Sequence, residues 1–144
     1  MYSNPYKALY SVAPPRRTGL GEYRYIIRAI AEAEIVMNDE LCVVLSTAPD
    51  RASAERIGEA LLTERLATCV QYEAIRSQYW WQGALCTDDE VRLTIKTRRA
   101  LYGTVEAAIL RLHPYDCPQV LCLAVDAVSA GYQAWAAVSA NPAV

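Results

Sequence analysis

Ser77-Gln-Tyr79-Trp-Trp81-Gln-Gly83 is the stretch that decides the fold, because it ends one strand and turns the chain into the next. Alternate residues of a strand lie on the same face, so Ser77, Tyr79 and Trp81 should share one face. Gly83 can adopt the positive φ that a tight hairpin turn often needs. The sequence therefore predicts a turn at Gln82-Gly83.

Two long strands flank this turn. Ala67-Thr-Cys-Val-Gln-Tyr72 and the run through Trp81 predict one long or bulged strand. Glu90-Val-Arg-Leu-Thr-Ile-Lys96 alternates strictly between charged or polar and apolar residues, which is typical of a strand with one buried face. We expect Val91, Leu93 and Ile95 to face the core.

Further elements follow on both sides of the hairpin. The apolar run 41–45 predicts a strand, and residues 54–62 have the spacing of an amphipathic helix. A second helix is expected over 101–112, and it should stop before Pro114 because the residue preceding a proline is disfavoured in the α region. A fourth strand over 120–125 and a terminal helical turn after Gly131 complete the pattern.

The order β-α-β-β-α-β predicts an α+β, ferredoxin-like sandwich: a four-stranded antiparallel sheet with two helices on one face, plus a short C-terminal helix. The other face of the sheet and the edges of the long hairpin need a cover. Head-to-tail contacts between identical chains would close a ring. We therefore predict a homotrimer, in which three open sheet faces meet around an axis.

Composition limits the class of protein. A chain of 144 residues, 53% of them hydrophobic, can bury one core, and its net charge of −2 offers no broad basic surface for nucleic acid. No apolar run approaches the roughly 18 residues of a membrane span. The five cysteines are odd in number and form no Cys-x-x-Cys pair, which favours reduced thiols in a cytoplasmic protein.

Residues 1–36 differ from the rest and are predicted to be an N-terminal extension, partly helical or disordered, with a compact domain over 37–144. A transit peptide is an alternative because this segment carries several arginines, although its glutamates and few serines argue against one. Met37 could be the natural start of the domain.

Five separated motifs, in this order, resemble those of the CutA divalent-cation tolerance family. They are Val43-Val-Leu-Ser-Thr47-Ala-Pro49, Leu66-Ala-Thr-Cys69-Val70, Ser77–Gly83, Ile95-Lys96-Thr97 and His113-Pro-Tyr-Asp-Cys-Pro118. The resemblance covers about residues 41 to 138. It implies a ferredoxin-like fold, a tight homotrimer, a cytoplasmic setting in bacteria and a role in tolerance to copper and other divalent ions. The family has no settled catalytic activity, and its relatives in fold include trimeric P-II nitrogen-regulatory proteins.

The resemblance also implies candidate metal contacts. His113 matches the histidine of the family's His-Pro-Tyr motif, and Cys69 matches its cysteine after the first helix. Departures from the family pattern make a copper site poorer in soft and imidazole ligands. Ser46 stands where some bacterial members have Cys, Leu112 where some have a second His, and Asp116 and Gln119 replace residues usual in the motif.

The residues themselves leave two interpretations of the metal site open. His113 could ligate Cu(II) or Zn(II), with Asp116, Cys117 or a neighbouring subunit completing the site. Alternatively, His113 makes a hydrogen bond at a helix end or at a subunit interface. Cys69 could be a ligand or a small packed residue, as we expect for Cys42 and Cys122, whereas Cys86 and Cys117 should be exposed.

A second candidate site is a cleft between subunits that binds a small anion or metabolite, as in a P-II-like sensor. Its predicted lining is Tyr79, Trp81, Lys96, His113 and Tyr115. Packing of aromatic residues in the trimer interface explains the same pattern. The acidic run Asp88-Asp89-Glu90 is more typical of a solvated turn than of a divalent-ion site.

The sequence does not support other protein families that share this fold. The chain has no Phe for an RNA-recognition motif and no Cys-x-x-Cys for a copper-chaperone loop. No Ser-His-Asp set, carboxylate pair or phosphate-binding glycine loop indicates an enzyme. We therefore predict a non-enzymatic trimer for copper and other divalent-cation tolerance, with weak metal binding at subunit interfaces. The alternatives are a P-II-like metabolite sensor, or a scaffold whose trimer is the functional product.

Overall fold

A computed structural model describes residues 41–142 of the chain. The predicted extension over residues 1–36 lies outside the described residues, and the domain boundary at Met37 stays a prediction.

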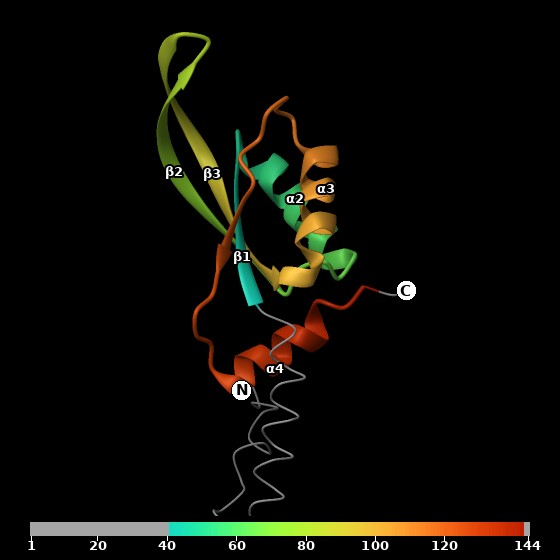
Figure 1. The fold of residues 1–144 in the computed structure, drawn as a ribbon. Coiled ribbons are helices and arrows are strands. Elements are labelled where there is room, and N and C mark those ends of the chain that lie inside the picture. The colour runs from blue at the N-terminus through green and yellow to red at the C-terminus, as the bar shows by residue number, and fades with distance from the viewer. Residues whose placement is uncertain (1–40, 143–144) are drawn as a thin grey trace, which may run out of the picture. The chain divides into compact units, whose positions relative to one another are not determined.

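The described residues form four strands and three α-helices in the predicted order (Figure 1). Their bounds are β1 Leu41–Ala48, α2 Arg51–Thr63, β2 Cys69–Trp81, β3 Ala84–Arg98, the 3-10 turn η1 Arg99–Leu101, α3 Tyr102–Leu112, β4 Leu121–Ala124 and α4 Ala130–Ser139. The strands pair antiparallel in the order β2-β3-β1-β4. The ferredoxin-like arrangement inferred from the sequence is confirmed.

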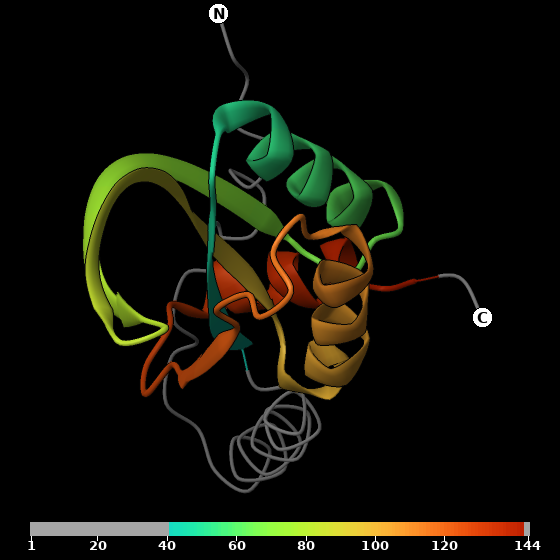
Figure 2. The same ribbon diagram turned by 90° about the horizontal axis from the view of Figure 1, so that it is seen from above.

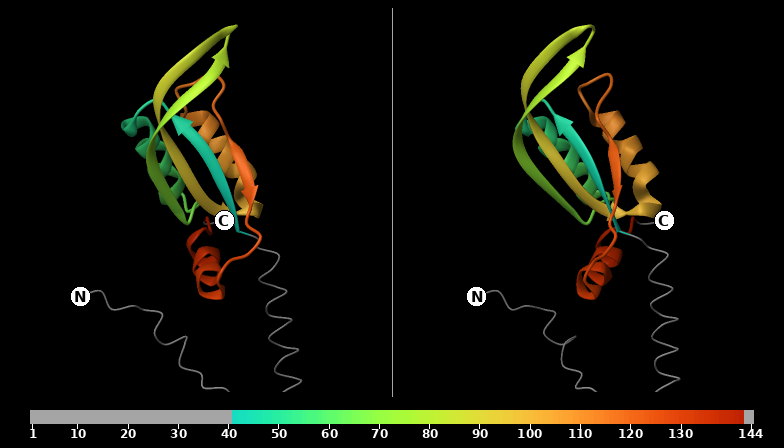
Figure 3. Two further views of the ribbon diagram at one scale, coloured as in Figure 1. Left: turned by 90° about the vertical axis from the view of Figure 1, so that its left-hand side faces the viewer. Right: turned by 60° about the vertical axis from the view of Figure 1, so that its left-hand side comes forward.

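Helices α2 and α3 cover one face of this sheet, and no helix of the described residues lies across its other face, which α4 contacts only near Lys96 (Figures 2 and 3). The core lies between the two layers and consists of short and branched apolar side chains from both. Its largest fully buried members include Ile57, Leu61, Leu93, Ile95 and Ile109. Leu93 and Ile95 face the core as predicted, while Val91 packs against its margin.

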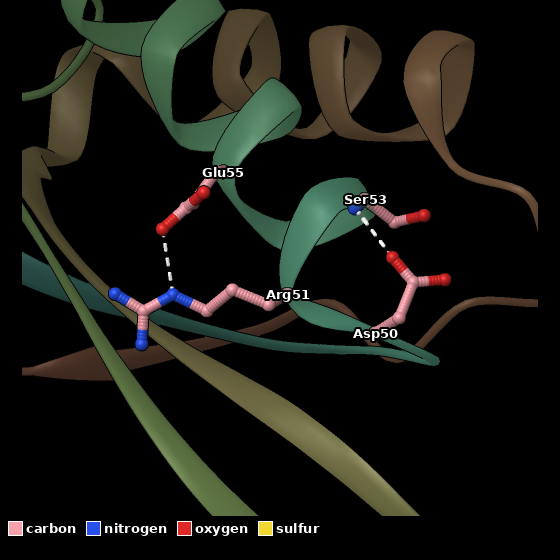
Figure 4. A network of polar contacts seen from close by, with 4 residues as sticks. All are labelled: Asp50, Arg51, Ser53 and Glu55. Atoms are coloured by element: carbon pink, nitrogen blue, oxygen red, sulfur yellow. Dashed lines mark hydrogen bonds and ion pairs between the residues drawn. The ribbon is translucent and has the colours of Figure 1, made fainter.

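Helix α2 begins where the sequence changes from apolar to cap-forming residues. The Asp50 carboxylate accepts a hydrogen bond from the backbone N–H of Ser53 at 2.7 Å, which caps the helix and lowers the pKa of Asp50 (Figure 4). Arg51 pairs with Glu55 one turn further along (Figure 4). Gly58 is required on the inner face, because a Cβ there would collide with the Tyr72 hydroxyl on β2.

The β2–β3 hairpin turns at Gln82 and Gly83, with φ values of 49° and 82°, as predicted. Positive φ at both central residues defines a type I′ turn, whose twist matches that of the strands. The β2–β3 register runs from Cys69 opposite Lys96 to Trp81 opposite Ala84, but β1 accompanies β3 only as far as Val91. Residues 75–90 therefore project past the sheet as a two-stranded ribbon, which we call the hairpin arm (Figure 1).

The C-terminal region contains the predicted strand and short helix, with slightly different bounds. Strand β4 spans Leu121–Ala124 and is shorter than the expected 120–125. The short C-terminal helix is confirmed: α4 begins at Ala130 and contains Tyr132, Trp135 and Val138, as predicted. Tertiary contacts stabilise its last carbonyl groups. The Arg65 side chain donates to the carbonyl of Val138 at 2.6 Å, and Arg98 donates to that of Ala140 at 3.0 Å.

Candidate functional site

His113 ends helix α3 in an extended conformation, with φ −77° and ψ 138°, as its position before Pro114 predicts. Its Nε2 lies 2.7 Å from the carbonyl oxygen of Thr47 at the end of β1. Its Nδ1 accepts a hydrogen bond from the backbone N–H of Tyr115 at 3.1 Å. These two contacts specify the neutral tautomer with the proton on Nε2.

Both imidazole nitrogens are therefore engaged with the protein backbone. This geometry favours the structural interpretation of His113, in which the ring ties the α3–β4 loop to β1. A metal ion could bind to this ring only after one of the two hydrogen bonds opens.

Tyr115 extends the same connection to the hairpin arm. Its ring centroid lies 5.0 Å from that of His113, and its hydroxyl donates to Glu90 Oε1 at 3.1 Å. Burial raises the pKa of Tyr115 to about 12, with the hydrogen bond to Glu90 and the charge of Glu90 as further causes. Glu90 itself is buried, so its carboxylate keeps a fixed partner at the base of the arm. We call Thr47, Glu90, His113 and Tyr115 the loop–arm junction.

Tyr79 makes a similar bond further along the arm. Its hydroxyl donates to Asp88 Oδ2 at 2.6 Å, and this bond is the main cause that raises the pKa of Tyr79 to about 12. The acidic residues of the arm thus act as hydrogen-bond acceptors and ion-pair partners, since Asp89 also pairs with Arg76.

The predicted metal ligands do not converge within one chain. Cys69 lies opposite Lys96, whereas Thr47, which holds His113, lies opposite Arg92. These positions are four residues apart on β3, or about 13 Å along the strand. Asp116 and Cys117 are exposed in the α3–β4 loop. No group of three or more His, Cys, Asp or Glu among residues 41–142 is placed to hold a metal ion. A site shared between subunits stays a prediction.

The predicted pocket residues also separate into groups within a chain. His113 and Tyr115 meet at the loop–arm junction, and Trp81 is half exposed at the tip of the arm. Lys96 lies instead beside α4, with its Nζ 5.7 Å from the centroid of the Tyr132 ring. A pocket that unites all five residues requires more than one chain and stays a prediction.

Exposed apolar side chains gather in two places. On the hairpin arm, Trp80 is 74% exposed and Leu85, directly opposite it, is 61% exposed. On the edge strand β4, Leu121 and Leu123 are about half exposed. Sequence reasoning missed Leu85 and both β4 leucines. For Leu121 and Leu123, alternation with Cys122, which packs against the core, was an available signal, whereas the exposed start of β3 gave none for Leu85.

Two polar features were also missed. Ser46 is fully buried, and its hydroxyl is the one buried side-chain N or O atom within the described part of the chain that lacks a hydrogen-bond partner. Cys42 and Cys122, expected to be small core residues, are also diagonal neighbours on β1 and β4, and the Cys122 thiol adds to the rise that burial causes in the pKa of Cys42. Cys42 is fully buried as expected, while Cys122 is partly exposed at the sheet edge, and Cys86 is less exposed than expected.

Comparison with known proteins identifies relatives of this fold. The family model described as CutA1 divalent ion tolerance protein matches residues 42–139. The divalent-cation tolerance protein CutA of Pyrococcus horikoshii is 39% identical over 95 residues, which are 66% of this chain and 93% of that protein.

Solved structures agree with this result. The crystal structure of CutA1 from Pyrococcus horikoshii has a TM-score of 0.68 and 36% identity, covering 69% of this chain and 98% of that one. The periplasmic divalent cation tolerance protein CutA from Archaeoglobus fulgidus has a TM-score of 0.69 and 27% identity, covering 70% and 99%. The motifs, the strand order and these matches agree, and the chain belongs to the CutA1 divalent ion tolerance protein family.

Proposed function

We propose that the protein is a homotrimer that acts in tolerance to copper and other divalent cations, and that it binds the ion weakly at subunit interfaces. The observation that carries the proposal is the pair of exposed apolar surfaces, one on the hairpin arm and one on β4. The functional side chains of a single chain are too scattered to form a site. Assembly is therefore the step on which a shared site depends.

The two surfaces suit a head-to-tail contact. The arm offers Trp80, Trp81 and Leu85, while β4 offers Leu121 and Leu123 at an unpaired sheet edge. Burying a large apolar side chain contributes about 1.5–3 kcal/mol, so covering these five residues is a substantial driving force. A contact between two different surfaces of identical chains closes into a ring when the rotation allows it.

The face on which Cys69 lies supports the same arrangement for a shared ion site. Cys69 lies on the open face of the sheet, because its neighbours Val70 and Tyr72 pack on the helix side. Meeting of open faces would bring Cys69 of one chain toward residues of another. Imidazole, carboxylate and thiolate are suitable ligands for Cu(II) or Zn(II), and each subunit contributes one His113, one Asp116 and one Cys117.

The proposal assigns the protein no catalytic step and places it in the cytoplasm. Five free cysteines in a chain of this length are compatible with a reducing compartment. None of the described helices is long and apolar enough to cross a membrane. The location is not uniform among relatives, since the Archaeoglobus fulgidus protein is described as periplasmic.

Sedimentation equilibrium of the full chain, followed by calorimetry with Cu(II) and Zn(II), tests the proposal. We expect a trimer, and we expect His113→Ala to weaken ion binding more than Tyr115→Phe, which disturbs the same junction without removing a ligand. A monomer at micromolar concentration would refute the assembly. Equal affinities in His113→Ala and Tyr115→Phe would remove His113 from the ion site. A panel of small anions in the same calorimeter tests the P-II-like alternative.

A further inference from the structure

Cys42 on β1 and Cys122 on β4 lie side by side beneath the start of helix α3. In the β1–β4 register, Cys42 is opposite Ala124 and Cys122 is opposite Val44, so the two cysteines are diagonal neighbours on the same face. Both contact the core cluster between the sheet and the helices. Neither belongs to the loop–arm junction or to the predicted metal ligands.

The register places the two thiols near each other in a protected environment. Burial raises the pKa of Cys42 to about 12, and the neighbouring Cys122 thiol is the next cause. Arg99 of η1 acts in the opposite direction and favours negative charge on Cys42. Tyr102 of α3 donates its hydroxyl to Glu106 Oε1 at 3.2 Å. Burial raises the pKa of Tyr102, Glu106 raises it further, and the two thiols contribute last.

Strand geometry argues against a disulfide between these residues. Diagonal neighbours in an antiparallel pair are about 7–8 Å apart at Cα, with Cβ atoms somewhat closer. A disulfide requires Cβ atoms about 3.5–4.5 Å apart, and strain rises steeply beyond that range. Closing the bond would therefore pull β1 and β4 out of register.

Diagonal neighbours instead leave room for an ion between their two sulfurs. Metal–thiolate bonds of about 2.3 Å place the two sulfurs about 4.6 Å apart when the ion lies on the line between them. Cu(I), Ag(I) and Hg(II) are soft d10 ions that accept two thiolates in this linear arrangement. Two donors are sufficient for such an ion, whereas a divalent first-row ion needs more ligands than this place offers.

We propose that Cys42 and Cys122 form a binding site for a soft, two-coordinate metal ion of the Cu(I) class. The ion replaces both thiol protons, and the Arg99 guanidinium offsets the single negative charge of a monovalent ion held by two thiolates. Cys122 is partly exposed on a four-residue edge strand, so a small opening of β4 gives the ion access to the buried Cys42. This site is independent of the trimer and of His113.

A full-length variant with Cys69→Ser, Cys86→Ser and Cys117→Ser keeps only the proposed pair. Under anaerobic reducing conditions, with Cu(I) delivered from a competing chelator, we expect this variant to bind one Cu(I) per chain with the affinity of the wild type. X-ray absorption should show two sulfur ligands. Titration in buffers of different ionisation enthalpy should show that two protons leave per ion.

Adding Cys122→Ser to that variant should weaken Cu(I) binding at least a hundredfold, because a hydroxyl is a poor ligand for a soft ion. Circular dichroism of this four-site variant should match that of the three-site variant, since Cys122 is only partly buried. Loss of Cu(I) binding in the three-site variant while it remains folded would overturn the proposal. Unchanged affinity after Cys122→Ser would overturn it as well. Because the probe is Cu(I) and His113 is intact throughout, neither result depends on the outcome of the Cu(II) experiment.

Discussion

Replacing Ser46 by alanine should stabilise the protein, although the residue is fully buried. The Ser46 hydroxyl has lost its water and has no hydrogen-bond partner. A buried polar group without a partner costs about 1–3 kcal/mol of folding free energy. Alanine removes that cost and leaves only a small void where the hydroxyl was. We expect a net gain of about 1 kcal/mol in the free energy of unfolding.

Thr97 provides the matched control on the neighbouring strand β3. It is also fully buried, but its hydroxyl donates to the carbonyl oxygen of Leu66 at 2.6 Å. Thr97→Val keeps the shape and leaves that carbonyl without its partner, which should destabilise the protein by about 1–3 kcal/mol. The two substitutions delete the same chemical group and should have opposite signs.

Chemical and thermal denaturation measure both effects, at one fixed protein concentration because assembly contributes to apparent stability. A gain of about 1 kcal/mol corresponds to a rise of about 4–8 °C in the melting temperature of a domain of this size. Ser46→Cys should also stabilise, since a thiol loses less than a hydroxyl when it is buried without a partner. If Ser46→Ala destabilises as much as Thr97→Val, the Ser46 hydroxyl has a partner, such as a buried water, and the reasoning is wrong.

Three further predictions concern packing, pH and assembly. Gly58→Ala should destabilise the fold by more than about 1 kcal/mol, because the added methyl group would collide with the Tyr72 hydroxyl. Gly103→Ala is the control, since a Cβ at Gly103 would meet no atom within 4 Å, and it should leave the stability unchanged. Thermal melts compare the two variants. The pKa of Tyr115 is raised to about 12 in the folded state, so the unfolded chain loses the phenol proton at a lower pH. The free energy of unfolding should therefore fall as the pH rises from about 10 toward 12. Urea titrations at several pH values should show a shallower fall in Tyr115→Phe. Trp81→Ala should weaken self-association by a few kcal/mol (about 2–4) if its half-exposed ring is covered in the assembly, and an unchanged sedimentation profile would place Trp81 outside the interface.

Local patterns in the sequence were sufficient for most of the fold. The alternation around Leu93 and Ile95 depends only on the two-residue period of a strand. The turn at Gln82-Gly83 was indicated by Gly83, although Gln82 also adopts a positive φ. The last residue of α4 could not be obtained in this way. That helix continues to Ser139 because Arg65, more than seventy residues earlier, binds its terminal carbonyls.

The candidate sites were harder to predict for the same physical reason. The position of His113 at a helix end followed from Pro114, but its partner Thr47 depends on where β1 ends in three dimensions. The contact between Cys42 and Cys122 depends on the register of β1 against β4, which two short apolar runs do not specify. The apolar strand around each cysteine therefore indicated a core residue, as the structure confirms for Cys42, but not that the two cysteines are neighbours.

The loop–arm junction connects the structural role of His113 with the proposed assembly. A two-stranded ribbon that extends beyond its sheet has few contacts to fix its direction, and the exposed Trp80 and Leu85 would then sample many positions. Tyr115 holds Glu90 at the base of that ribbon, and His113 holds Tyr115 and Thr47 together. Orienting the arm before contact reduces the entropy that association must overcome. His113 can thus matter for the trimer without touching a metal ion, and Tyr115→Phe separates the two roles, because it loosens the arm while leaving the imidazole in the chain.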